Sequence, residues 1–81
     1  MKLVGYKSDN DIELSEGRHI KIYNRREGNK LMIDGYIEYL PSAFMINNHD
    51  GSKYLLFWYI REQVFENDIP NREKYKIEVA E

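Results

Sequence analysis

Two segments rich in aliphatic and aromatic residues, separated by a short polar stretch, constrain the fold of this 81-residue chain most. In residues 31–40 apolar and polar side chains alternate, as they do in a β-strand with one buried face. Residues 54–60 are apolar throughout, and we predict a strand over 53–60 that pairs with the first one. The Asp50-Gly51 dipeptide between the two segments predicts a hairpin turn. Paired strands of this kind are typical of a small β-sheet or β-barrel.

The strand expected over 31–40 contains a glycine in the middle of its alternation. Period-two geometry places on one face Leu31, Ile33, Gly35, Ile37 and Tyr39. Asp34 and Glu38 then lie on the opposite face. A glycine at such a position indicates a bulge or a sharp bend, by which a strand curls around a small barrel. Pro41 ends the strand because it has no N–H to donate to the ladder.

Weaker patterns predict the remaining elements. Short strands are expected at 2–7, at 18–24, near 44–46 and at 75–79, with Lys74, Lys76 and Glu78 pointing outward. Polar turns are expected at 8–11, 25–30 and 47–52, with a turn or short strand at 61–65 and a loop at 67–71. A short helix over 11–16 is the competing interpretation of that segment. Several short strands separated by turns predict one all-β domain that spans residues 1–81.

The chain is small and contains no cysteine. A core of this size rarely contributes more than about 3–5 kcal/mol on its own, so we consider self-association into a homo-oligomer. The lack of cysteine excludes disulfides and thiolate metal sites and gives no reason to expect an oxidising compartment. No apolar run is long enough to span a membrane, and the N-terminus lacks the pattern of a signal peptide. We therefore expect a cytoplasmic protein with no membrane contact.

The segment from Glu16 to Val64 resembles the small barrels of the Sm-like and SH3-like families. It has a glycine before the first strand, a bent strand with Gly-x-Ile, a hairpin turn and an apolar strand that runs into a short turn. Residues 35–39, followed by 44–46, are similar to the corresponding passage of bacterial Sm-like RNA chaperones, and Ile60-Arg61 is similar to the Ile-Arg of the second Sm motif. The resemblance implies one SH3-like or Sm-like barrel of five to six short antiparallel strands, with one short helical turn.

The chain departs from the Sm-like pattern at the positions that bind RNA in that family. Residues 40–43 read Leu-Pro-Ser-Ala where Sm proteins place Asp and Asn, and Phe57-Trp58 replaces a basic and imidazole pair. Glu62 stands where a glycine follows the Ile-Arg pair. The resemblance therefore implies the architecture, and it does not transfer RNA binding residue by residue.

No sequence pattern typical of catalysis or metal binding is present. His19 and His49 are the two histidines of the chain, and the turn explains why Asp50 follows His49. Asp34 and Glu38 are a carboxylate pair that a solvated strand face explains. The five glycines are scattered singly, so there is no phosphate-binding loop. We predict a non-enzymatic protein with no catalytic residues, metal or cofactor; a small hydrolase would need a cleft that joins a histidine to carboxylates.

Basic residues gather in one part of the sequence although the formal net charge is −2. From residue 17 to 30 there are five basic residues against one acidic residue. Arginine and tyrosine together can hold a phosphate and stack on a base. A candidate site for a nucleotide or a short single-stranded nucleic acid consists of Arg18, Lys21, Tyr23, Arg25, Arg26 and Lys30. The alternative is a solubilising loop.

The aromatic run Phe57-Trp58-Tyr59 is the second candidate site. One face of a strand packs inward, so part of this run could be exposed and bind a partner; coverage of both faces is the alternative. We favour a binding protein that recognises a protein partner or itself. An inhibitor of a host factor, encoded by a phage or mobile element, is one form of this hypothesis suggested by the small size and composition. Nucleic-acid binding by the basic hairpin is the alternative function.

Overall fold

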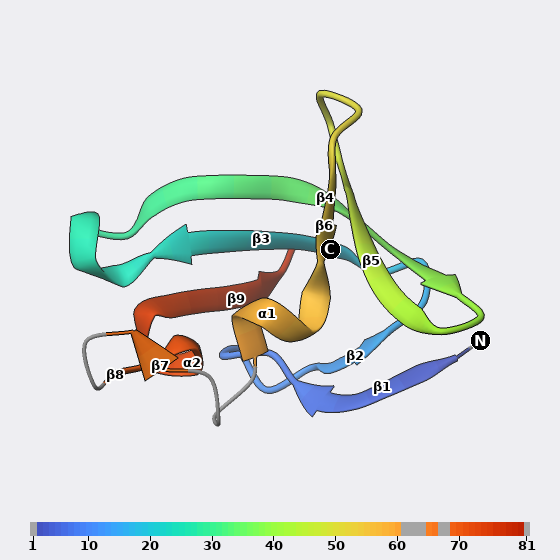
Figure 1. Ribbon diagram of the computed structural model, residues 1–81, viewed down its shortest axis with the longest axis horizontal. Coiled ribbons are helices and arrows are strands. Elements are labelled where there is room, and N and C mark those ends of the chain that lie inside the picture. The colour runs from blue at the N-terminus through green and yellow to red at the C-terminus, as the bar shows by residue number, and fades with distance from the viewer. Residues whose placement is uncertain (1, 61–64, 67–68, 81) are drawn as a thin grey trace.

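The computed structural model describes residues 2–60, 65–66 and 69–80 and consists mainly of β-strands (Figure 1). The strands are β1 (Leu3–Lys7), β2 (Glu13–Ser15), β3 (His19–Asn24), β4 (Lys30–Leu40), β5 (Ala43–Asn48), β6 (Lys53–Leu55), β7 (Phe65–Glu66), β8 (Ile69–Pro70) and β9 (Tyr75–Val79). The helical segments are η1 (Arg25–Glu27), α1 (Leu56–Ile60) and α2 (Asn71–Lys74). An antiparallel sheet has the strand order β6-β5-β4-β3-β9, and β1-β2 and β7-β8 form two-stranded sheets.

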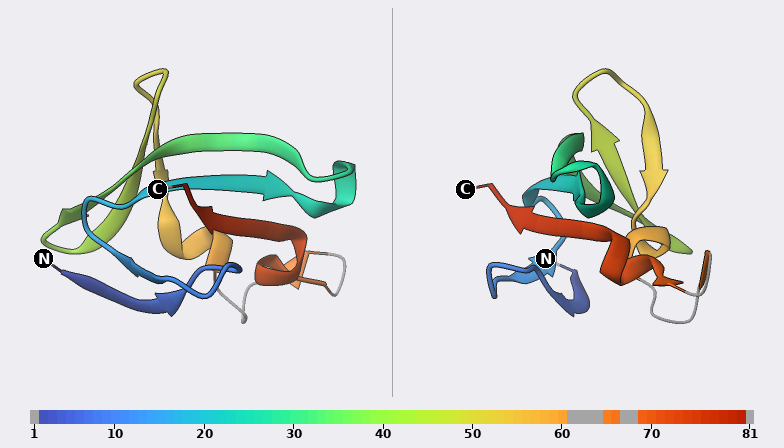
Figure 2. Two further views of the ribbon diagram at one scale, coloured as in Figure 1. Left: turned by 180° about the vertical axis from the view of Figure 1, so that it is seen from behind. Right: turned by 90° about the vertical axis from the view of Figure 1, so that its left-hand side faces the viewer.

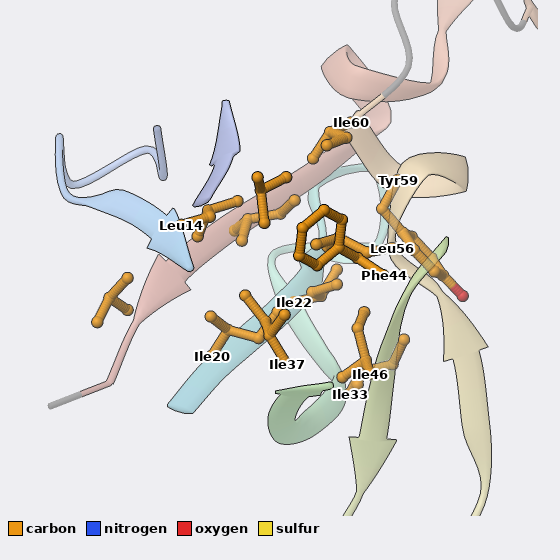
Figure 3. Packing of buried hydrophobic residues seen from close by; sticks show 13 residues of the cluster. Leu14, Ile20, Ile22, Ile33, Ile37, Phe44, Ile46, Leu56, Tyr59 and Ile60 are labelled. Atoms are coloured by element: carbon orange, nitrogen blue, oxygen red, sulfur yellow. The ribbon is translucent and has the colours of Figure 1, made fainter. Parts of the chain in front are cut away.

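The hydrophobic core lies between the inner face of the five-stranded sheet and two covering elements, α1 and the β1-β2 hairpin. The hairpin lies on the side of the molecule opposite β3 and β4 in both views (Figure 2). Side chains from β2, β3, β5 and α1 converge in the interior (Figure 3), where Leu14, Ile20, Ile46 and Leu56 are completely buried. Every fully buried aliphatic side chain adds roughly 1.5–3 kcal/mol to folding, so this cluster determines which face of each strand points inward.

The irregularity in β4 lies at Met32 and not at Gly35. Ile22 pairs with Ile33, but Tyr23 pairs with Leu31, so Met32 is the extra residue of a bulge. Because the bulge changes the alternation, Leu31 leaves the inner face on which it was expected and is 46% exposed. Gly35 keeps the regular register, and a Cβ atom there would meet the backbone of β5. The glycine allows two strands to approach closely.

The strand predicted over 53–60 is wrong beyond Leu55, and its predicted pairing with the strand over 31–40 is wrong as well, because β6 pairs with β5 and not with β4. Strand β6 ends at Leu55 and the helical turn α1 follows, with Leu56, Tyr59 and Ile60 buried. These three positions have the i, i+3, i+4 spacing of one helix face, whereas a strand would bury every second residue. A continuous apolar run does not distinguish a buried strand from a buried helix. The tertiary packing on the core decides between them.

The strands expected at 2–7, 18–24, 31–40, 44–46 and 75–79 are confirmed. A helix over 11–16 is wrong, because β2 forms there and pairs with β1. Lys74 is not an outward residue of the last strand. It belongs to α2 and is 4% exposed, with its ammonium 5.6 Å from the ring centroid of Tyr75.

In the segment between α1 and β9, the expected loop at 67–71 contains strand β8 and the first residue of α2. Of the turn or strand expected at 61–65, only Phe65 is described, and it belongs to β7. Residues 61–64 and 67–68 lie outside the described residues.

The all-β, antiparallel fold class is confirmed. Closure of the strands into an SH3-like or Sm-like barrel stays a prediction, because the strand order places β6 and β9 at the two ends of the main sheet. Within the described ranges, no helix combines the length and the apolar character needed to cross a membrane.

Candidate functional site

The side of the five-stranded sheet that faces away from the core is the candidate site, and we call it the outer face. Ile20 and Ile22 of β3 point inward, so the residues between and beside them point outward, and the strand pairings extend this pattern across the sheet. The outer face consists of His19, Lys21, Tyr23, Leu31, Asp34, Tyr36, Glu38, Leu40, Met45, Asn47, Lys53, Leu55, Lys76 and Glu78.

A histidine, a carboxylate and a tyrosine meet at the centre of the outer face. Nε2 of His19 on β3 donates a hydrogen bond to Oδ1 of Asp34 on β4. The imidazole also stacks on the ring of Tyr36, with centroids 4.8 Å apart and planes 21° apart. The hydrogen bond from His19, together with the positive charge of Lys21, lowers the pKa of Asp34. His19 is thereby held in one orientation by two neighbours on β4.

The other carboxylates of the outer face are paired as well. Oε2 of Glu38 accepts hydrogen bonds from Nζ of Lys53 and from Nδ2 of Asn47, both at 3.1 Å, and these bonds lower the pKa of Glu38. Nζ of Lys76 lies 3.1 Å from Oε1 of Glu78. Each acidic group of the outer face thus has a basic or imidazole neighbour from the same face. The face carries little net charge.

Apolar and aromatic side chains remain exposed between these pairs. Tyr36 is 56% exposed, Leu31 and Leu55 are each 46% exposed, and Leu40 is 38% exposed. Tyr23 and Met45 are half-buried on the same face. Tyrosine and methionine are enriched at protein–protein interfaces, so these side chains make the outer face a candidate interface.

The six residues of the predicted nucleic-acid site lie in three different environments. Lys21 and Tyr23 are on the outer face, and Lys21 lies across from Asp34 and Glu78 on the neighbouring strands. Arg18 is half-buried just before β3, where its carbonyl oxygen accepts a hydrogen bond from the Ile37 N–H at 3.0 Å. The remaining three, Arg25, Arg26 and Lys30, belong to the hairpin that joins β3 to β4.

Within that hairpin, Arg25 has a structural role that sequence reasoning missed. Its guanidinium donates hydrogen bonds to Oδ1 of Asp9 at 3.0 Å and to the carbonyl oxygen of Tyr75 at 3.2 Å. Arg26 and Lys30 are exposed at the end of the hairpin, and no ion pair of either is found with another described residue. Of the six predicted residues, these two are the ones most accessible to an anionic ligand.

The predicted aromatic site at 57–59 is divided between core and surface. Tyr59 is 8% exposed, and its burial raises the pKa of its hydroxyl. Phe57 is half-buried, with its ring centroid 6.1 Å from that of Phe44 and 6.3 Å from that of Tyr6. Trp58 is 46% exposed. Of the three residues, Trp58 is therefore the one that a partner could contact most directly.

Sequence reasoning missed the grouping of His19, Asp34 and Tyr36. Alternation predicted that Asp34 points outward, but the cross-strand register that brings His19 opposite Tyr36 depends on the bulge at Met32. In the described part of the chain, histidine, aspartate and glutamate side chains form no group of three or more suited to a metal ion.

Comparisons of the chain with protein-family models, with curated proteins and with solved structures find no match. The resemblance to Sm-like and SH3-like barrels therefore stays a prediction.

Proposed function

We propose that this protein is a non-enzymatic interaction module that binds a protein partner through the outer face of its five-stranded sheet. The observation that supports this proposal most is the exposure of Tyr36, Leu31 and Leu55 beside carboxylates that already have charged partners. Burying an unpaired charge in an interface is costly, whereas covering apolar surface between paired charges is favourable. The complementary partner surface is apolar at its centre and carries no large net charge.

The central His19–Asp34 pair fits a binding role better than a catalytic one. A histidine that acts as a general base needs a nucleophile within hydrogen-bond reach. The ring of Tyr36 is stacked on the imidazole at 21°, so its hydroxyl lies in a plane almost parallel to the ring of His19, and Nε2 of His19 is hydrogen-bonded to the carboxylate of Asp34. The pair holds Tyr36 in place and leaves more than half of its surface exposed for a partner.

The test compares two exposed aromatic residues on different sides of the molecule. Proteins captured from a lysate by the immobilised wild type are identified, and the affinity of the most abundant one is then measured by calorimetry. Tyr36→Ala on the outer face is expected to weaken binding at least tenfold, because central tyrosines dominate many interfaces. Trp58→Ala on α1 is the matched control and is expected to retain affinity. If Trp58→Ala weakens binding and Tyr36→Ala does not, the binding site is the aromatic run at 57–59. If both variants bind as tightly as the wild type, both sites are excluded.

A second candidate function is the binding of a short single-stranded nucleic acid or nucleotide at the end of the β3-β4 hairpin. It is favoured by the exposure of Arg26 and Lys30 and by the position of Lys76, whose ammonium lies 5.8 Å from the ring centroid of Tyr23. The double variant Arg26→Ala/Lys30→Ala should then lose affinity for a labelled oligonucleotide, while Lys53→Ala on β6 should not. Affinity should also fall steeply when the salt concentration is doubled. Lack of binding at low salt would exclude this candidate.

A further inference from the structure

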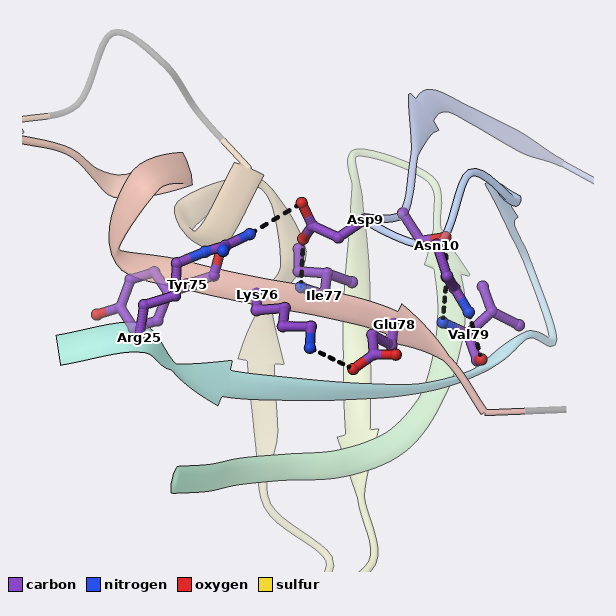
Figure 4. A network of polar contacts seen from close by, with 9 residues as sticks. Asp9, Asn10, Arg25, Tyr75, Lys76, Ile77, Glu78 and Val79 are labelled. Carbon is purple, nitrogen blue, oxygen red and sulfur yellow. Dashed lines mark hydrogen bonds and ion pairs between the residues drawn. The ribbon is translucent and has the colours of Figure 1, made fainter. Parts of the chain in front are cut away.

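The free edge of β9 is occupied by the turn that joins β1 to β2. The main-chain N–H of Asp9 donates to the carbonyl oxygen of Ile77 at 2.7 Å, and Oδ2 of Asp9 accepts from the N–H of Ile77 at 2.7 Å (Figure 4). The side-chain amide of Asn10 does the same for Val79, donating through Nδ2 and accepting through Oδ1, both at 3.1 Å. The main-chain N–H and C=O groups of Ile77 and Val79, which face away from β3, are thereby all hydrogen-bonded.

These bonds reproduce what a neighbouring strand would supply. In an antiparallel pair, alternate residues exchange both their N–H and their C=O with the opposite strand. Ile77 and Val79 are alternate residues, and each exchanges two hydrogen bonds with the turn. Asp9 and Asn10 therefore act as a substitute strand. An uncovered edge of this kind is a template for pairing with another chain.

The guanidinium of Arg25 fastens the turn to the sheet. It bridges Oδ1 of Asp9 and the carbonyl oxygen of Tyr75, at the point where β9 begins. Within the turn, the N–H of Ile12 donates to the hydroxyl of Ser8 at 3.1 Å. Apart from the main-chain bond from Asp9 to Ile77, the bonds that hold the cap on β9 come from side chains of two hairpins. These bonds are separate from the ladders that set the register of the five-stranded sheet.

The opposite edge of the sheet, strand β6, is protected against pairing without a cap. Strand β6 is three residues long and carries an exposed lysine, Lys53. Short edge strands and lysines are two ways in which proteins prevent edge pairing. Strand β9 is longer, from Tyr75 to Val79, and is rich in residues that favour strands. The edge that could pair with another chain is the one that is capped.

We propose that the turn at residues 8–11 is a removable cap over a dimerisation edge, and that the occupant of the uncapped edge is β9 of a second copy of this chain. Antiparallel pairing about a two-fold axis at Ile77 uses the outward N–H and C=O groups that the cap now binds. This register places Lys76 opposite Glu78 of the partner subunit, and the reverse. Opposite charges directly across an antiparallel pair are stabilising, so the edge is complementary to itself. The inference does not depend on the binding of a partner to the outer face, although Lys76 and Glu78 belong to that face.

The test removes the cap and measures the mass of the folded protein by light scattering over a wide range of concentrations. Asp9→Ala/Asn10→Ala is expected to show twice the mass of the wild type, in a concentration-dependent equilibrium. Asp50→Ala is the matched control, because it removes a 2.9 Å turn bond to the N–H of Ser52 far from β9. Its mass should equal that of the wild type. Circular dichroism establishes that each variant is folded.

Charge reversal then tests the register of the new dimer. Adding Lys76→Glu to the uncapped variant places glutamates opposite each other and should abolish the doubling, while Lys76→Glu together with Glu78→Lys should restore it. A folded, uncapped variant that has the wild-type mass would overturn the proposal, as would a dimer indifferent to Lys76→Glu. If the double variant does not fold, Asn10→Ala alone is measured. If that variant also fails to fold, the turn is part of the folding core and is not a removable cap.

Discussion

Replacing Gly35 with alanine should destabilise the fold severely, although the added group is a single methyl. The new Cβ would overlap the carbonyl oxygen of Asn47 and lie 2.7 Å from its carbonyl carbon and 2.9 Å from Cα of Asn48. All three atoms belong to the backbone of β5, so no side chain can rotate away. Overpacking alone costs about 1–3 kcal/mol. Moving β5 also strains its ladder to β4, including the 3.0 Å bond from the N–H of His49 to Asp34, at roughly 1 kcal/mol a bond.

The expected loss is therefore about 3–5 kcal/mol, which is a large part of the 5–15 kcal/mol typical of a folded domain. Urea unfolding followed by tryptophan fluorescence measures it, with Gly17→Ala as the control. Gly17 has a φ of 88° with open space around it, so alanine there costs only the strain of a left-handed backbone, roughly 1–2 kcal/mol. Gly35 has no such φ, and alanine without a clash would stabilise by about 0.4–1 kcal/mol. A Gly35→Ala variant as stable as the wild type would refute the close approach of the strands.

Three further perturbations follow from the described contacts. Leu56→Ala should cost about 2–5 kcal/mol in urea unfolding, because Leu56 is completely buried in α1, whereas the same change at the 46% exposed Leu55 should cost under about 0.5 kcal/mol. Asn48→Ala should cost about 1–3 kcal/mol and speed hydrogen exchange of the Asp34 amide, since Oδ1 of the buried Asn48 accepts that N–H at 3.0 Å. His19→Ala should raise the pKa of Asp34 toward its usual value, as followed by carboxyl NMR. Because the pKa of Asp34 is lower in the folded than in the unfolded protein, its carboxylate contributes to the free energy of unfolding at pH values above the unfolded pKa of about 3.9. This contribution disappears as the pH falls through the folded pKa. The stability gap between wild type and His19→Ala should narrow over that acid range, and a gap that widens there would contradict the assignment.

The strands with alternating residues could be predicted from the sequence, but the partners of their outward residues could not. The hairpin from β3 to β4 closes at the pair Asn24 and Lys30, and counting back from it without a bulge places His19 opposite Gly35. The extra residue at Met32 shifts the count by one and brings His19 opposite Tyr36. A one-residue shift exchanges faces. The grouping of His19, Asp34 and Tyr36 at the centre of the outer face therefore depends on a bulge that no local sequence pattern predicts.

The segment after the second hairpin shows a different limit. Residues 54–60 have no polar residue to reveal a period, so strand and helix are equally compatible with the pattern. The choice depends on the core, which accepts Leu56, Tyr59 and Ile60 as one helical face. The helix also divides the predicted aromatic site, because it buries Tyr59 and leaves Trp58 exposed. A strand would have placed Phe57 and Tyr59 on the same side.

Charge offers the clearest contrast between sequence and structure. The stretch 17–30 is basic when counted along the chain, yet Arg25 pairs with Asp9, and Lys21 lies between Asp34 and Glu78, each from another strand or turn. Within this stretch, Arg26 and Lys30 at the hairpin end keep accessible basic charge. A ligand on the outer face should consequently bind with little dependence on salt, whereas a nucleic acid at the hairpin should release counterions and bind with strong dependence. One affinity series in salt thus separates the two candidate functions before the partner's structure is known.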